Sequence, residues 1–85
     1  MGSIMSAEPG ARLFVKILAE RRCEAGVPIQ NTIARVWAVE AGLNGSELDE
    51  ALKFAGEKEW IEDGDREGTF NLTQAGHAVG SAERG

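Results

Sequence analysis

The stretch between residues 46 and 76 restricts the fold of this chain more than any other part of the sequence. Apolar residues at helical spacing lead straight into Trp60-Ile61, and an acidic turn over residues 62–68 follows. Residues 69–72 then alternate between polar and apolar side chains in the manner of a half-buried strand. The stretch therefore predicts a helix, a strand, a charged turn and a second strand, in that order.

Five residues define the expected hairpin. Phe70 and Leu72 stand at alternate positions and are expected on its buried face. Gly64 and Gly68 bound the turn, where positive φ angles are needed and glycine adopts them without steric cost. Trp60 follows the helix into the sheet, so we expect its large side chain in the core.

A first helix is expected near the start of the chain. Pro9 suits its first turn, because the N–H that proline lacks is not needed there. Gly26 and Pro28 cannot continue a helix, so this one should end near residues 23–25. Val27, which stands between these two helix breakers, is a candidate for pairing at a sheet edge.

The second and third helices are expected to form a helix-turn-helix. The second begins near residues 29–32 and ends at Gly42-Leu43, a left-handed stop with its apolar contact. The third begins only a few residues later, and so short a connection makes a helix-turn-helix. The residues expected to face the core are Ile29, Ile33, Val36 and Trp37 on the second helix and Leu48, Ala51, Leu52 and Ala55 on the third.

A last helix is expected after the hairpin. Thr73 is placed to cap it, and it should span residues 74–79. Gly76 and Gly80 have low helix propensity, so we expect this helix to be short and weak.

The length of the chain and its cysteine content limit what it can be. The chain has 85 residues, enough for one small domain, and its single cysteine, Cys23, excludes an intrachain disulfide. Cys23 and the single histidine, His77, are too few ligands for a zinc site, so we expect no metal and no cofactor. A lone cysteine suits a reducing compartment, and we expect the cytoplasm. We expect a disordered lead over residues 1–8, one domain over 9–80 and a disordered tail over 81–85.

The order of helix, helix, helix and hairpin resembles the winged-helix superfamily. This resemblance implies an α+β fold: a three-helix bundle with a helix-turn-helix, plus a small antiparallel β-hairpin that forms the wing. One position departs from the pattern, because Glu59 stands where such families often place a glycine in a left-handed conformation, at a cost of about 1 kcal/mol. The segments that carry the similarity are Ile33-Ala34, Ala41-Gly42-Leu43, Glu47–Ala55, Trp60-Ile61-Glu62 and Phe70–Gly76.

The third helix and the turn are acidic, although winged helices usually bind nucleic acid through these two elements. Residues 47–59 hold five acids against Lys53 and Lys58, and residues 62–67 hold four acids against Arg66, so each segment has a net charge of −3. Affinity for DNA comes largely from Lys and Arg side chains that neutralise phosphates, and like charges oppose docking. The candidate partner-binding residues are Ser46, Glu47, Glu50, Lys53, Phe54, Glu57, Asp63, Asp65 and Arg66.

A basic flank is expected on the first helix. Its members are Arg12, Lys16, Arg21 and Arg22, and Glu20 is the single acid among them. Two interpretations stay open: the flank is a solvated face that keeps the domain soluble, or it associates with the acidic flank of another copy.

We therefore predict a small non-enzymatic binding module with a regulatory role, and a partner protein that offers a basic surface. The alternative is a DNA-binding winged helix of the transcription-regulator type, which is the ordinary occupation of the fold. No nucleophile with a placed base and no glycine-rich phosphate loop is recognisable, so catalysis is not expected. No apolar run in the sequence is long enough to span a bilayer, so we expect no membrane partner. The oligomeric state is left open between a monomer and a weak homodimer.

Overall fold

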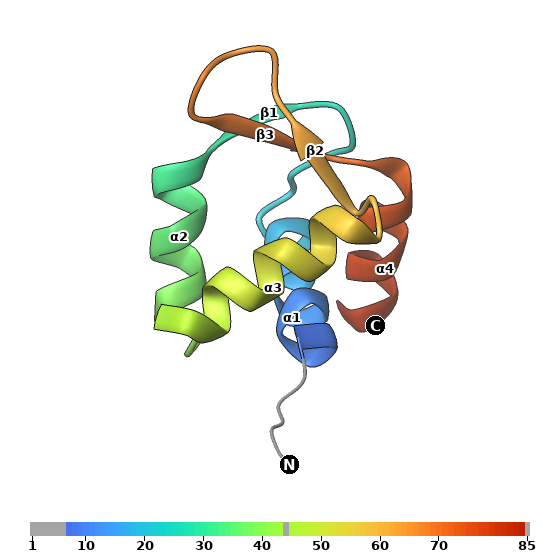
Figure 1. Ribbon diagram of the computed structural model, residues 1–85. Helices are drawn as coiled ribbons and strands as arrows, with labels where there is room; N and C mark the ends of the chain where they lie inside the picture. The colour runs from blue at the N-terminus through green and yellow to red at the C-terminus, as the bar shows by residue number, and fades with distance from the viewer. Residues whose placement is uncertain (1–6, 44, 85) are drawn as a thin grey trace.

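The structure is a computed structural model that describes residues 7–43 and 45–84 (Figure 1). Over these residues the chain is an α+β domain of four helices and a three-stranded antiparallel sheet. This architecture has the predicted class and is compatible with a winged-helix-like arrangement. In chain order the elements are α1 (Ala7–Glu20), β1 (Pro28–Gln30), α2 (Asn31–Glu40), α3 (Gly45–Glu57), β2 (Ile61–Asp63), β3 (Thr69–Leu72) and α4 (Gln74–Arg84).

The sheet is centred on β3. The strand order is β1-β3-β2, and both outer strands pair with β3 in antiparallel fashion. Phe70 and Leu72 of β3 are buried, as the alternation predicted. Ile29 lies opposite Phe70 in β1 and is also buried, so its predicted place on the second helix is wrong: pairing with β3 puts its side chain in the core. The strand begins at Pro28, and the side chain of Val27 just before it stays exposed.

The helix α1 is the centre of the helical layer, because α3 and α4 both pack against it (Figure 1). Its buried residues therefore extend around more of the helix than a single apolar stripe. The helix ends at Glu20, earlier than predicted, because Arg22 adopts a left-handed φ of 64°. The N–H of Cys23 then donates to the carbonyl of Leu18 at 3.0 Å and closes the helix. The buried residues of α1 are Ala11, Phe14, Val15, Ile17, Leu18 and Ala19.

Regular structure extends further at both ends of the domain than predicted. The first helix begins at Ala7, within the segment expected to be a disordered lead, and Pro9 lies in its first turn. The rest of that lead, residues 1–6, lies outside the described part of the chain. At the other end, α4 continues through residues 81–84, so the predicted disordered tail is wrong for these residues.

Two glycines explain why α4 is longer than predicted. The predicted cap is confirmed, since the N–H of Gly76 donates to Oγ1 of Thr73 at 3.0 Å. Gly76 and Gly80 are both buried, and a Cβ atom on them would overlap the carbonyl oxygens of Trp60 and Val15, respectively. The two glycines therefore let α4 pack closely on α1 and on the start of β2, and this packing outweighs their low helix propensity.

The helix α2 buries a different face from the predicted one. Its buried residues are Ala34 and Ala38. Ile33 and Val36, which were expected to face the core, are exposed, and Trp37 is only half-buried. The predicted orientation of this helix is therefore wrong. The small side chains of Ala34 and Ala38 enter the core, and the larger apolar residues are left outside.

The helix α3 follows α2 after a short connection, as predicted for a helix-turn-helix. Gly42 has a φ of 102°, and the N–H of Leu43 donates to the carbonyl of Ala38 at 2.9 Å, so the left-handed stop is confirmed. Leu52 is half-buried and packs against the core. The buried residues of α3 are Leu48, Ala51 and Ala55, three of the four that were predicted.

The turn between β2 and β3 needs its two glycines for different reasons. Gly68 has a φ of 80°, as predicted. Gly64 has no positive φ. Glycine is needed there because it has no side chain, and a Cβ atom at this position would overlap Oγ1 of Thr69. Glu59, just before β2, has a φ of 61°, so the non-glycine residue expected at a left-handed helix stop is confirmed. Trp60 is buried, also as predicted.

Candidate functional site

The solvent face of α3 carries the first group of candidate residues. This helix crosses in front of α1 in Figure 1 and turns its buried face toward the core. The polar candidates on α3 stand away from that buried face and are all exposed: Ser46, Glu47, Glu50, Lys53 and Glu57. Within the described part of the chain, none of the five takes part in an ion pair. The face therefore offers carboxylates whose charge is not already neutralised.

Phe54 joins α3 to β2. The side chain is half-buried, and its ring meets that of Trp60 edge to face, with the centroids 5.6 Å apart and the planes at 64°. The ammonium of Lys58 lies 5.5 Å from the centroid of the Phe54 ring. The geometry thus gives Phe54 an internal contact in addition to any surface it offers a partner.

The turn between β2 and β3 carries the second group. The candidates here, all exposed, are Asp63, Asp65 and Arg66. The backbone of the turn is held at two points. Thr69 donates to the carbonyl of Arg66 from both its N–H, at 3.1 Å, and its Oγ1, at 2.7 Å. The N–H of Asn31, the first residue of α2, donates to the carbonyl of Gly68 at 2.9 Å. The candidate side chains therefore project from a turn whose backbone is held by hydrogen bonds.

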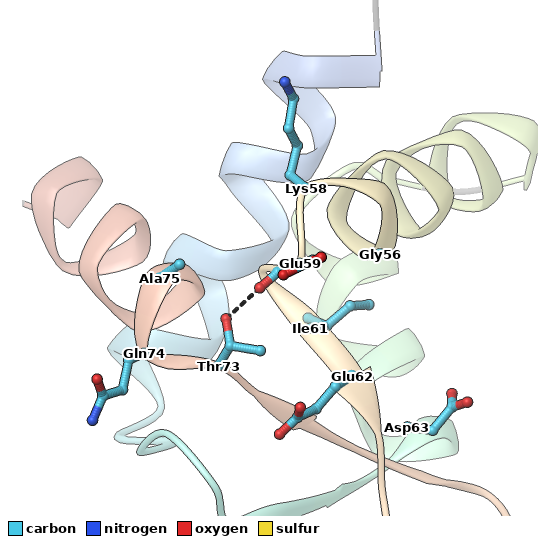
Figure 2. A pocket seen from close by; sticks show the side chains of 9 residues that line it. All are labelled: Gly56, Lys58, Glu59, Ile61, Glu62, Asp63, Thr73, Gln74 and Ala75. Carbon is cyan, nitrogen blue, oxygen red and sulfur yellow. Dashed lines mark hydrogen bonds between the residues drawn. The ribbon is translucent and has the colours of Figure 1, made fainter.

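An open hollow lies where α3 ends, beside β2 and the start of α4 (Figure 2). Its volume is about 730 Å³. Glu59, Glu62, Asp63 and Lys58 are among the residues that line it, and Ile61 adds apolar surface; Figure 2 shows the side chains of Glu62 and Asp63 on opposite sides of β2. Because carboxylates outnumber cations in this lining, the hollow suits a positively charged side chain better than an anion. We call it the acidic hollow.

A second and smaller hollow, of about 180 Å³, lies between α2, α3 and the sheet. It shares Ile61 and Asp63 with the acidic hollow, so β2 lies between the two. The apolar residues of its lining are Phe14, Ala34, Leu52, Ile61 and Phe70, and the polar ones are Asn31, Arg35, Asp63 and Thr69. This hollow suits an apolar side chain that enters beside a charged one.

The strand β2 also has a free edge, because it lies at the outside of the sheet. Glu62 pairs with β3, Trp60 accepts a hydrogen bond from Thr73 just after β3, and Gly64 donates one to Thr69 at the start of β3. In an antiparallel strand, the backbone N–H and carbonyl groups of successive residues point alternately to the two edges of the strand. Those of Ile61 and Asp63 therefore point away from β3, to the open edge. Both residues also line the two hollows, so backbone and side-chain contacts are offered at one place.

Charge is strongly segregated along the chain. Residues 47–67 carry nine carboxylates and three cations, a formal charge of −6, whereas the whole chain has −5. Asp49, which lies 3.8 Å from Arg35, is the one carboxylate of this segment found in an ion pair among residues 7–43 and 45–84. The α3 face, β2 and the turn therefore form a surface of strongly negative potential.

Two of the four cations of the basic flank form ion pairs with acids of the same domain in the described part of the chain. Arg12 lies 2.9 Å from a carboxylate oxygen of Glu8 and 3.1 Å from one of Glu83 on α4. Its hydrogen bonds to Glu8 and then Glu83 raise the pKa of the Arg12 guanidinium. The charge of Arg12 thus serves to link α1 with α4.

Another cation of the flank is also engaged. Arg21 lies 3.6 Å from Glu40 of α2, and its guanidinium sits 4.9 Å from the centroid of the Trp37 ring. Of the other two members, Lys16 is half-buried and Arg22 is exposed. The structure therefore spreads the four predicted cations along α1 and just beyond its C-terminal end, without forming an open basic patch.

The candidate residues do not make one compact patch. Glu57 stands between Gly56 and Lys58, which both line the acidic hollow, so the end of α3 and β2 come together. Ser46 and Glu47 lie at the other end of α3, and Figure 1 shows the β2–β3 turn reaching toward α2. The candidates therefore lie along a band that runs from α3 over β2 to the turn.

Sequence reasoning missed three residues of this band. Glu59, Ile61 and Glu62 line the acidic hollow, but in the sequence they appear only as a helix stop and a strand. Their acidity was visible, and it contributed to the predicted charge of the segment. Their position next to the start of α4 results from tertiary packing, which a local sequence pattern does not predict.

No protein-family model, curated protein or solved structure matches this chain. Among the described helices, none combines the length and the apolar character that crossing a bilayer requires. Across the same residues, no three histidine, cysteine or carboxylate side chains come together in a group that could hold a metal ion.

Proposed function

We propose that this chain is a winged-helix protein-interaction module that binds a basic segment of a partner protein. Its binding surface, the acidic surface, comprises the solvent face of α3, β2 and the turn over residues 64–68. The observation that supports this most is the concentration of carboxylates, since residues 47–67 have a formal charge of −6 and ion pairing in the described structure engages only Asp49. Complementary charge steers encounter and selects partners, so such a surface favours a cationic segment.

The order of elements supports the winged-helix part of the proposal. A helix-turn-helix, α2 and α3, is followed directly by the hairpin of β2 and β3. The strand β1 precedes α2 and joins the hairpin through β3. This layout agrees with the resemblance that the local sequence carries, and α4 then closes the domain against α1.

The hollows beside β2 support a protein partner in particular. A lysine or arginine side chain suits the acidic hollow, and a neighbouring apolar side chain suits the smaller one. Buried anchors of this kind supply most of the binding energy at protein interfaces, with the surrounding charges setting specificity. The domain would then act by holding or masking a partner, which is a regulatory role without catalysis.

DNA binding is the alternative, and the geometry disfavours it. A duplex placed against α3 would meet the carboxylates of Glu47, Glu50 and Glu57 before any phosphate contact formed. Lys58 packs over the Phe54 ring, which leaves few cations on this side to neutralise phosphates.

Parallel NMR titrations test the proposal. The ¹⁵N-labelled chain is titrated at low salt with a synthetic peptide that alternates arginine and valine, and separately with duplex DNA. We expect saturable amide shifts along α3 and β2 with the peptide, weakening as salt is added, and no such shifts with DNA. Saturable DNA shifts on α3 and the turn would contradict the proposal, as would peptide shifts that are absent or lie on other elements.

A pair of charge-matched variants sharpens the test. The double substitution Glu50→Lys with Glu57→Lys reverses two carboxylates of the acidic surface, and should weaken peptide binding by about tenfold or more. Glu20→Lys with Glu24→Lys makes the same charge change at exposed positions elsewhere, and should have a much smaller effect. Equal losses for both variants would mean that net charge, and not this surface, attracts the peptide.

A further inference from the structure

The outer side of α2 is unusually apolar for a solvent-facing helix. Ile33 is 43% exposed, Val36 56% and Val39 50%. Figure 1 shows α2 at one edge of the molecule, and the residues it buries toward the interior are Ala34 and Ala38. The helix therefore turns its largest aliphatic side chains away from the core of its own domain.

These three residues form one continuous strip. Residues three apart on a helix are neighbours on its surface, so Val36 has Ile33 on one side and Val39 on the other. Single apolar residues on a surface are ordinary, whereas contiguous apolar surface is typical of interaction sites. All three are β-branched, and β-branched residues have lower helix propensity than alanine. Helix propensity therefore does not explain why they stand at these exposed positions.

We propose that this strip, the α2 face (Ile33, Val36 and Val39), is where two copies of the chain associate. The strip is symmetric about Val36, because an aliphatic residue stands three positions to each side. In an antiparallel pair of α2 helices related by a two-fold axis, Val36 meets Val36, and the Ile33 and Val39 side chains of both copies flank this central contact on its two sides. Such a self-complementary face fits a second copy of this chain directly.

Charges at the ends of α2 complement each other in the antiparallel pair. The first turn has no acidic residue, and its N-cap, Gln30, makes no side-chain hydrogen bond to the helix. The second copy brings its Glu40 to this end, where the positive end of the helix dipole favours a carboxylate, although the N–H of Asn31 is already bonded to Gly68. Oε1 of Glu40 lies 3.6 Å from Arg21 of its own chain, which leaves Oε2 for the neighbouring helix.

The cation closest to the centre of the strip does not oppose this arrangement. Arg35 adjoins Val36, so the two Arg35 side chains of a dimer approach the axis. Each one lies 3.8 Å from Asp49 of its own α3, which offsets its charge. The acidic surface remains available in each copy, because the α2 face does not include it.

The dimer should be weak. One helix face buries far less than the roughly 1,600 Å² of a standard interface. Each copy also carries a formal charge of −5, so two copies repel at low salt. We therefore expect association in the upper micromolar to millimolar range, with no loss when salt screens the repulsion.

Sedimentation equilibrium of the full chain and its variants tests this. Val36→Glu places two carboxylates on the axis and should weaken the dimer by at least about tenfold. Val27→Glu is the matched control, since Val27 is 47% exposed but lies before β1, away from α2, and should leave association unchanged. A wild-type chain that stays monomeric up to millimolar concentration, or equal effects of the two variants, would overturn the proposal.

Two further measurements separate this dimer from association of basic with acidic flanks. Contacts between opposite charges dissociate in high salt, whereas the α2 dimer should persist, so dissociation by salt would count against the α2 face. In a Cys23→Ser background, Val36→Cys should form an intermolecular disulfide under mild oxidation, and Val27→Cys should not. Equal cross-linking at both positions would overturn the proposed register, while unchanged NMR spectra would show that the variants fold.

Discussion

Phe54 on α3 and Trp60, the residue just before β2, meet edge to face, with ring centroids 5.6 Å apart. This contact spans the junction where the chain leaves α3 and enters the sheet. The acidic hollow lies at the same junction, because Gly56, Lys58 and Glu59 between the two rings all line it. The internal packing of one aromatic pair therefore positions the surface that we propose to bind a partner.

Loss of this pair should lower stability. We expect Phe54→Ala to reduce the free energy of unfolding by about 2 kcal/mol, since the side chain is half-buried and the aromatic contact adds to the loss of apolar burial. Urea unfolding followed by tryptophan fluorescence measures this. Phe54→Leu keeps most of the apolar surface and should cost less, and a neutral Phe54→Ala would mean that the ring contact does not hold the junction.

Two glycines in helices should respond to alanine in opposite directions. Gly80→Ala should destabilise the domain by about 2 kcal/mol or more, because the new Cβ atom would overlap the carbonyl of Val15 on α1. Gly56→Ala should stabilise it by about 0.5–1 kcal/mol, since a Cβ atom there meets nothing within 4 Å and alanine favours the helix. Thermal unfolding followed by circular dichroism compares them, and a shift of the same sign for both would contradict the close packing of α4.

Glycine should be better than glutamate at the end of α3. Glu59 has a φ of 61°, which costs a residue with a side chain about 1 kcal/mol, so Glu59→Gly should raise the free energy of unfolding by somewhat under that amount. Glu57→Gly removes the same charge from the last residue of α3, where glycine favours the helix less, and should lower it by about 0.5 kcal/mol. Chemical unfolding of the two variants checks the signs, and destabilisation by Glu59→Gly would show that the left-handed conformation is not strained.

The thiol of Cys23 should be slow to react in the folded chain. Burial raises the pKa of Cys23, because the thiolate loses hydration, and the charge of Arg21 only partly opposes this. Alkylation by iodoacetamide should therefore be slower in the native than in the urea-unfolded chain near pH 8, and the native rate should rise at higher pH than the unfolded one. A native profile with its midpoint at or below the unfolded one would contradict this.

The same shift predicts the sign of a pH effect on stability. Because the pKa of Cys23 is raised, the folded state binds the thiol proton more tightly than the unfolded state does. The contribution of Cys23 is then fully present below the pKa of the unfolded chain and is lost as the pH rises toward the raised value. Cys23→Ser should reduce the loss of stability on the alkaline side, as measured by urea unfolding across that range.

Local patterns in the sequence predict the parts of the fold that depend on local interactions. The alternation of Phe70 and Leu72 fixes which face of β3 is buried, and Gly42 with Leu43 fixes where α2 ends. Both signals act within a few residues, so they are visible without knowledge of the rest of the chain. The charge of the acidic surface is visible for the same reason.

The remaining features depend on contacts between distant segments. Ile29 is in a strand because Phe70, far along the chain, pairs with it, and helical spacing alone suggests a helix. Gly80 appears as a helix breaker until Val15 of α1 is seen beside it. In α2, the size of Val36 suggested the core, whereas the smaller Ala34 and Ala38 occupy it. The position of the acidic hollow likewise follows from tertiary packing.

The hydrogen bond from the N–H of Asn31 to the carbonyl of Gly68 links the β2–β3 turn to the first residue of α2. A molecule that binds the turn and restricts its motion should therefore also stabilise the hydrogen bond of the Asn31 amide. Hydrogen–deuterium exchange of this amide therefore measures binding at the turn without a label on the ligand. Slower exchange in the presence of the ligand would show that the turn has become more rigid.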